Sequence, residues 1–159
     1  MTITRAEIDA EDRRIAAILG VDNVVNFSQR GDGSVFAEMG DGVVHLKVRE
    51  RADMWDIGTY DDLDAFMYEV TEQATRSIGG SWEMEHRAEF PEDYDTRIGW
   101  HAKQLQLLTR INPVWGQRFR ASIAASDLGL SLEDIDAHPV EEHGKRRHTG
   151  PVRRLFNRQ

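Results

Sequence analysis

Apolar residues recur along the chain with two different spacings, and the change from one to the other predicts helices and strands. From Ile8 to Leu19 the apolar positions fall three or four residues apart, as on one face of an α-helix. Thr4 and Glu7 have the spacing of a capping box, and Gly20 is a typical residue just beyond a helix. We therefore predict a first helix between these boundaries.

After this helix the pattern becomes short runs of β-branched and aromatic residues. Two Gly-Asp-Gly sequences, at residues 31–33 and 40–42, separate the first three runs, and both residue types permit the positive φ of tight turns. The pattern predicts an antiparallel β-meander of three to four strands. The predicted strands cover residues 24–30, 34–39, 43–50 and a less regular run near 54–57.

Helical spacing returns over residues 63–78, with Thr59 or Asp61 as the predicted N-cap. The Gly79-Gly80 pair is the predicted end of this helix because glycine is common just after helices. One face of the helix is apolar and the other is polar. We therefore predict that it covers the sheet.

The next apolar pattern predicts a helical hairpin near the C-terminus. Residues 99–111 form its first helix, Asn112 is a good N-cap for the second, and Pro113 suits a first helical position. The second helix is predicted to reach about Leu128, before Gly129. With the sheet and the two earlier helices, this gives an α+β fold class.

Charge is unevenly distributed along the chain. It has 28 acidic and 20 basic side chains, a net charge of −8, but residues 144–159 hold six lysines or arginines and no acid. Residues 1–143 therefore carry 28 acids against 14 bases. A body that acidic repels nucleic acid and attracts basic partners over a screening length of roughly 8–10 Å. We predict one domain over residues 1–137 and a basic, flexible tail over residues 138–159.

Composition also excludes several kinds of chemistry. The chain has no cysteine, which excludes disulfides, thiolate catalysis and cysteine-based zinc sites. It shows neither a signal-peptide pattern nor an apolar run approaching the roughly 20 residues of a membrane span. The histidines and acids lack the spacing of common zinc and calcium motifs. We expect a cytoplasmic protein with no metal, no cofactor and no membrane partner.

The stretch from residue 83 to residue 95 is rich in acids and has no clean period. It contains six carboxylates and one arginine, which predicts a short strand or helical turn followed by an exposed acidic loop. Such a loop is often no more than a solvated surface. It can also fill a cationic cleft of a partner, where close charge pairs couple by ~1.5–7 kcal/mol. The candidate binding residues are Glu83, Glu85, Glu89, Glu92, Asp93, Tyr94 and Asp95.

The four tryptophans divide into two pairs. Trp100 and Trp115 lie on apolar helix faces and are predicted to pack in the core. Trp55 and Trp82 lie in less regular stretches, where an aromatic side chain can also anchor an interface.

Two other classes of function remain open. A small hydrolase or transferase could use His86 or His101 with a nearby carboxylate, although no catalytic motif surrounds either residue. The tail sequence GKRRHTGPVRRLFNRQ could contact nucleic acid. The acidic body and the single aromatic residue of that tail, Phe156, argue against a nucleic-acid partner.

Residues 96–123 resemble the immunity proteins of bacterial polymorphic-toxin systems, among them the family numbered sixty-three. In that family an arginine and an aromatic residue are followed by Gln-x-x-Leu-Leu and then by Ile-x-Pro-x-Trp. The match covers about a fifth of the chain, and most of its residues are structural. The matching positions are Arg97, Trp100, Gln104, Leu107, Leu108, Ile111, Pro113 and Trp115.

The resemblance implies an immunity protein that acts by stoichiometric binding and not by catalysis. Such a protein occludes the active site of a cognate toxin domain, often a basic nuclease or nucleotide-directed enzyme, inside the bacterial cytoplasm. An acidic surface on a rigid scaffold agrees with this function. The alternative function, suggested by the residues without the resemblance, is the small hydrolase or transferase with a histidine–carboxylate site.

Overall fold

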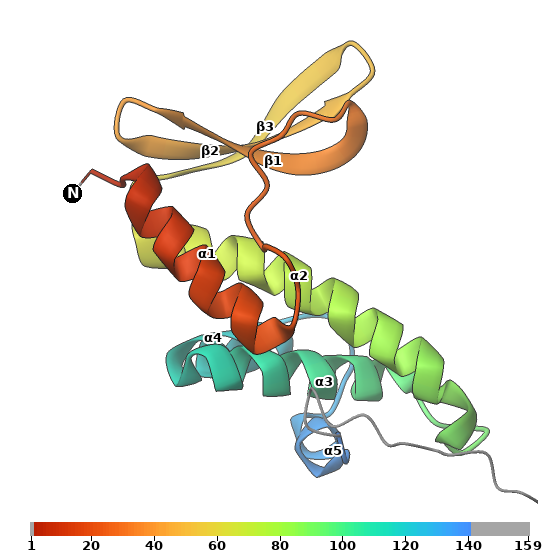
Figure 1. Cartoon of the computed structure of the whole chain (residues 1–159). Coiled ribbons are helices and arrows are strands. Elements are labelled where there is room, and N and C mark those ends of the chain that lie inside the picture. Colours follow the sequence, from red (N-terminus) through yellow and green to blue (C-terminus); the bar gives the residue numbers. More distant parts are fainter. Residues whose placement is uncertain (1, 141–159) are drawn as a thin grey trace, which may run out of the picture.

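The computed structural model describes residues 2–140, which form one three-stranded sheet and a set of helices (Figure 1). This confirms the predicted α+β class. In chain order the elements are α1 (Arg5–Leu19), β1 (Asp32–Gly40), β2 (Val43–Glu50), β3 (Asp53–Tyr60), α2 (Leu63–His86), the 3-10 helix η1 (Arg87–Glu89), α3 (Thr96–Ile111), α4 (Pro113–Ala124) and α5 (Leu132–Ala137).

Helix α1 begins and ends where the sequence predicted. The Thr4 side chain accepts the Glu7 backbone N–H, and the Glu7 carboxylate accepts the Thr4 backbone N–H, which completes the capping box. Gly20 has φ +70°, a left-handed conformation that glycine adopts without strain. Ile8 and Ile15 are fully buried on the face that the periodicity predicted.

The sheet has the strand order β1-β2-β3 and is antiparallel throughout. Asp41 and Gly42, with φ of +52° and +81°, make the tight turn between the first two strands. The run near residues 54–57 is confirmed as part of β3. Val44 and Leu46 of β2 are buried on the face toward the helices, whereas Lys47 on the opposite face binds Glu38.

The prediction of a strand over residues 24–30 was wrong. Asp12 of α1 accepts the backbone N–H groups of Val24 and Val25 at 2.6 and 3.0 Å, and the Asn26 carbonyl accepts one backbone N–H from β1 at 2.7 Å. These separate hydrogen bonds involve backbone groups of Val24, Val25 and Asn26 without the repeated pairing of a β-strand. The segment therefore follows the edge of β1 as irregular chain.

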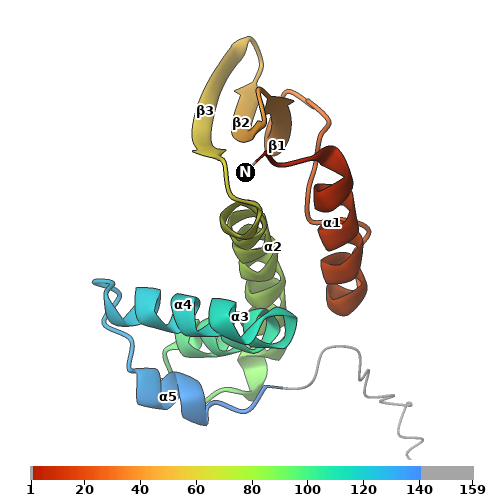
Figure 2. The same ribbon diagram turned by 90° about the vertical axis from the view of Figure 1, so that its left-hand side faces the viewer.

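The sheet lies at one end of the molecule, with α1 and α2 beneath it (Figures 1 and 2). Helix α2 has 24 residues, about 36 Å of helix, and runs from the sheet to the end formed by α3, α4 and α5. Its N-cap is Asp62, one residue after the predicted Asp61, and the Asp62 carboxylate accepts the Ala65 N–H at 2.8 Å.

Helix α2 does not end at Gly79-Gly80 but continues to His86, which corrects the prediction. A Cβ atom on Gly79 would lie 2.8 Å from Trp100 Cδ1 and 3.0 Å from the Trp100 carbonyl oxygen. The glycine thus lets α3 pack very close to α2. Gly79 is therefore required for the packing of α3 against α2, and it does not mark the end of a helix.

The predicted helical hairpin is present as α3 and α4. Asn112 caps α4 by accepting the Val114 N–H at 3.0 Å, and Pro113 occupies the first helical position. Helix α4 ends at Ala124, earlier than predicted. Ser131 caps α5, where its hydroxyl accepts the Asp134 N–H.

The domain body extends beyond residue 137. His138 packs among aromatic rings, and the Val140 carbonyl accepts a hydrogen bond from the Gln106 side chain at 3.4 Å. Residues 138–140 therefore belong with the body, whereas the basic stretch from Gly144 lies outside the described residues. No helix in residues 2–140 combines the length and the apolar character that crossing a membrane requires.

Candidate functional site

The predicted binding segment lies where α2 passes into α3, at the end of the molecule remote from the sheet. Glu83 and Glu85 belong to the last turns of α2, Glu89 ends η1, and Asp95 is the N-cap of α3. The predicted strand or turn at the start of this segment is therefore helix. Only residues 90–94 connect one helical element to the next.

Glu83 is a structural residue and not an exposed acid. Its side chain is 6% exposed, and its two carboxylate oxygens accept the Nε and Nη2 hydrogens of Arg87, each at 2.8 Å. These hydrogen bonds hold the pKa of the Glu83 carboxyl below its usual value. The pair ties the end of α2 to η1, so Glu83 offers no free carboxylate to a partner.

Asp95 also has local partners. Its carboxylate accepts the Arg97 backbone N–H at 3.1 Å and the Arg97 guanidinium at 2.9 and 2.7 Å. The guanidinium lowers the pKa of the Asp95 carboxyl. Asp95 thus caps α3 and sets the direction in which the chain enters it.

The other four acids of the predicted set are free of such contacts. Glu85, Glu89, Glu92 and Asp93 are exposed, and within residues 2–140 no basic side chain forms an ion pair with any of them. Within the described part of the chain, no ion pair neutralises these four charges. They therefore leave a negative potential at this end of the molecule that attracts a positively charged partner.

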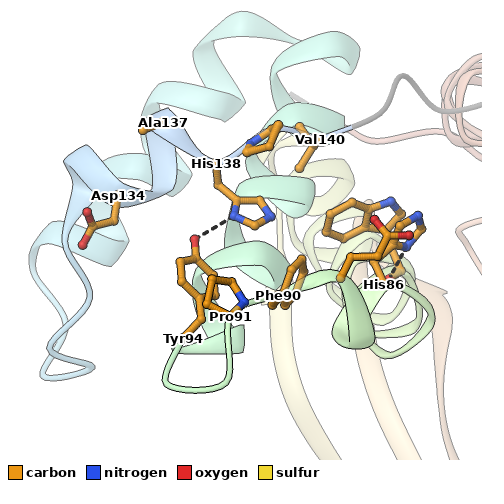
Figure 3. A pocket seen from close by; sticks show the side chains of 11 residues that line it. His86, Phe90, Pro91, Tyr94, Asp134, Ala137, His138 and Val140 are labelled. Carbon is orange, nitrogen blue, oxygen red and sulfur yellow. Dashed lines mark hydrogen bonds between the residues drawn. The ribbon is translucent and has the colours of Figure 1, made fainter.

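A cavity of about 610 Å³ lies beside these acids (Figure 3). It is bounded by the end of α2, by the connection to α3 and by α5 with the residues that follow it. The predicted residues Glu89 and Tyr94 contribute to its lining. The lining residues are Trp82, His86, Glu89, Phe90, Pro91, Tyr94, Asp134, Ala137, His138, Pro139 and Val140.

Aromatic rings hold the two sides of this cavity together. The Tyr94 hydroxyl and His138 Nδ1 are hydrogen-bonded at 2.7 Å, and Phe90 lies edge-on to His138 with ring centroids 5.1 Å apart (Figure 3). His86 stacks on Trp82 at 4.4 Å. The contacts join residues 82–94 to the chain after α5.

Burial changes the titration of both hydrogen-bonded groups. Desolvation raises the pKa of the Tyr94 phenol and lowers the pKa of the His138 imidazole, because each charged form loses contact with water. His138 Nε2 is buried and has no hydrogen-bond partner within the described residues. At neutral pH the ring is therefore uncharged and adds no positive charge to the cavity.

Sequence reasoning missed two contributors to this site, Asp134 and His138. Trp82 was a candidate interface anchor, Asp134 was not among the candidate binding residues, and His138 fell in the predicted tail. His138 lies 44 residues from Tyr94 in the sequence, and the two come together only when α5 folds back. No local pattern in the sequence reports such a contact.

In the part of the chain that the structure describes, neither histidine considered for catalysis forms a hydrogen bond or ion pair with a carboxylate. His86 Nδ1 lies 2.8 Å from the Trp82 carbonyl oxygen, and His101 Nδ1 lies 2.8 Å from the Arg97 carbonyl oxygen. Each ring thus bonds to the backbone one turn earlier in its own helix. Across residues 2–140 no group of three or more histidines and acids is arranged to hold a metal ion.

The residues that carry the family resemblance form the frame behind the site. Trp100 Nε1 donates to the Arg76 carbonyl at 2.9 Å, and Trp115 Nε1 donates to the Asp64 carboxylate at 2.9 Å, so each tryptophan fixes its helix to α2. Trp115 is 2% exposed, as predicted for a core residue. Gln104 also binds α2, through its amide to the Glu72 carbonyl at 3.0 Å.

Comparison with known proteins gave one match. Searches of curated proteins and of solved structures found no match. The sequence model of the family described as Immunity protein 63 matches residues 40–125, which run from the end of β1 to the end of α4. This range covers more than half of the chain and includes the whole α2–α3–α4 frame. The chain therefore belongs to the Immunity protein 63 family.

Proposed function

We propose that this protein neutralises a cognate bacterial toxin by stoichiometric binding, and that the acidic segment after α2 occludes the toxin's active site. The observation that carries the proposal is the cluster of free carboxylates at Glu85, Glu89, Glu92 and Asp93. Membership of an immunity-protein family supports a toxin as the partner. The contact chemistry is our inference from the charges.

The geometry around these acids supports a preorganised binding surface. The Glu83–Arg87 and Asp95–Arg97 pairs hold the two ends of the segment, and contacts of Phe90 and Tyr94 with His138 tie the residues between them to the chain after α5. A segment already ordered in the free protein loses little conformational entropy on binding. Glu83 and Asp95, two of the seven predicted contact residues, therefore act in this proposal by positioning their neighbours.

The charge of the segment indicates the chemistry of the partner. A basic toxin domain, such as a nuclease or a nucleotide-directed enzyme, has a cationic cleft for its phosphate-bearing substrate. Unpaired carboxylates would be steered toward that cleft and would occupy it in place of the substrate. In this proposal the complex forms in the bacterial cytoplasm, and the immunity protein catalyses no reaction.

The test is binding to the cognate toxin domain, measured by titration calorimetry at low salt. The variant carries Glu85→Lys, Glu92→Lys and Asp93→Lys, all at exposed positions. We expect its affinity to fall at least tenfold and the loss to shrink as salt is added. Rescue of growth during co-expression with the toxin domain should weaken in parallel.

A matched control reverses three exposed acids elsewhere, with Asp22→Lys, Glu50→Lys and Asp61→Lys. The two triple variants have the same net charge, so any difference between them reports the position of the charges. Equal affinities for the two variants would contradict the proposed contact. Turnover of a substrate by the purified protein would contradict the non-catalytic mechanism.

A further inference from the structure

The cavity beside the acidic segment has a lining of unusual chemistry for an acidic protein surface. Five of its eleven residues carry aromatic or imidazole rings, two carry carboxylates, and none is a lysine or an arginine. Its volume of about 610 Å³ falls within the 300–1,000 Å³ of typical ligand pockets. The cavity can therefore admit a whole side chain of a partner.

We propose that this cavity binds one arginine side chain of the toxin, which anchors the complex. The inference rests on the proposed function and names the group that the acidic segment would recognise. The aliphatic part of the arginine packs against Phe90 and Val140. Its guanidinium lies against the aromatic wall and is paired by the cavity's carboxylates.

The charges of the cavity support a cation as the guest. Glu89 and Asp134 both line it, and within residues 2–140 neither forms an ion pair with a basic side chain. His138 contributes no opposing charge, because it is neutral at pH 7. Both carboxylates are exposed, so a cation that enters the cavity gains their attraction, whereas an anion would be repelled by them.

The rings favour a guanidinium over an ammonium. A guanidinium is planar, is weakly hydrated and stacks on aromatic faces while its edge donates two parallel hydrogen bonds to a carboxylate. Tyr94 and Phe90 form the wall that such a group would meet. The buried Lys103 ammonium lies 5.8 Å from the centre of the Trp82 ring, and its like charge disfavours a second cation there, so we assign Trp82 to the cavity wall and not to the stacking contact.

This position makes Trp82 a reporter of occupancy. The protein has four tryptophans, and 5-fluorotryptophan labelling would give each a fluorine resonance, with Trp82 identified by Trp82→Phe. The probe is the tripeptide acetyl-Gly-Arg-Gly-amide. We expect a saturable shift of the Trp82 resonance with a dissociation constant of about 1 mM, and no shift for Trp55 on the remote β3 strand.

Matched peptides and variants test the assigned chemistry. The same peptide with citrulline, a neutral analogue of arginine, should bind at least tenfold more weakly, and a lysine peptide should bind several-fold more weakly. Glu89→Gln with Asp134→Asn should weaken arginine binding at least fivefold, whereas Glu50→Gln in the sheet should leave it unchanged. All three acids are exposed, so the variants should retain the fold.

Equal binding of the arginine and citrulline peptides would overturn the inference, as would no shift of Trp82 at 50-fold the expected dissociation constant, about 50 mM. Equal binding of the lysine peptide would overturn the preference for guanidinium. Because the peptide test needs no toxin, its failure is distinguishable from failure of the proposed function. If the peptide test fails but toxin binding still depends on Glu85, Glu92 and Asp93, the contact through the acidic segment stands and only the arginine anchor is refuted.

Discussion

The two adjacent glycines of α2 provide a sharp test of how the frame of the site is packed. Gly79 and Gly80 both lie inside a continuous helix, where alanine is intrinsically favoured over glycine by about 1 kcal/mol. They differ in what a new methyl group would meet. At Gly80 the nearest atoms belong to the Trp100 ring and lie 3.6–3.8 Å away, which is ordinary contact.

At Gly79 the same methyl group would lie 2.8 Å from a Trp100 ring atom and 3.0 Å from the Trp100 carbonyl oxygen. The ring cannot move freely, because its Nε1 donates to the Arg76 carbonyl at 2.9 Å. Overpacking of this kind costs about 1–3 kcal/mol, and a weakened indole hydrogen bond adds about 1 kcal/mol. Against the gain of about 1 kcal/mol in helix propensity, we expect Gly79→Ala to lower the free energy of unfolding by about 1–3 kcal/mol.

Gly80→Ala is expected to raise the free energy of unfolding by about 0.5–1 kcal/mol. Urea denaturation followed by circular dichroism measures both changes. With a slope of about 2 kcal/mol/M, the midpoints should move in opposite directions by roughly 0.3–1.5 M. Stabilisation by both alanines would refute the close packing of α3 on α2 at Gly79.

Two further predictions follow from the groups that titrate near the site. Glu83→Gln should lower stability at pH 7 by about 1 kcal/mol, a modest effect because Arg87 is largely exposed. Since the pKa of Glu83 is lowered in the folded protein, the stability that its carboxylate contributes is present above about pH 4.5 and is lost as the pH falls below that value. Urea midpoints for wild type and variant should therefore converge in acid, and a constant difference would contradict this. The pKa of His138 is lowered, so the unfolded chain binds its proton more readily and stability declines as the pH falls below about 6.5. His138→Asn should reduce the loss of stability between pH 7.5 and 5.5, measured by the same method, and parallel losses would argue against a buried neutral imidazole.

Local signals in the sequence predicted the helix starts well. Thr4 and Asn112 each cap the helix that their spacing indicated, and Gly20 ends α1 in the left-handed conformation. Each of these assignments depends on atoms within a few residues of one another. The physical cause is therefore contained in a short stretch of chain, which a sequence pattern can report.

The same local reasoning was wrong where a distant residue satisfied the backbone or filled the space. Residues 24–30 have the composition of a strand, but Asp12 binds two of their N–H groups. Gly79 has the appearance of a helix end, but it is required by the Trp100 side chain, 21 positions later. Neither partner is visible from the segment it affects.

The candidate site shows the same division between local and distant causes. Composition and charge patterning alone were sufficient to locate an acidic segment between residues 83 and 95 and to predict helices on both sides of it. Folding then decided which of its acids are free: helical spacing aligned Glu83 with Arg87, capping geometry occupied Asp95, and the remaining carboxylates stayed in solvent. The cavity depends on the return of α5 toward α2, which brings His138 to Tyr94. Hydrophobic spacing along the sequence determines which faces of the helices and strands are buried. Which residues then contact one another depends on packing between segments far apart in the sequence, and only the folded chain shows these contacts.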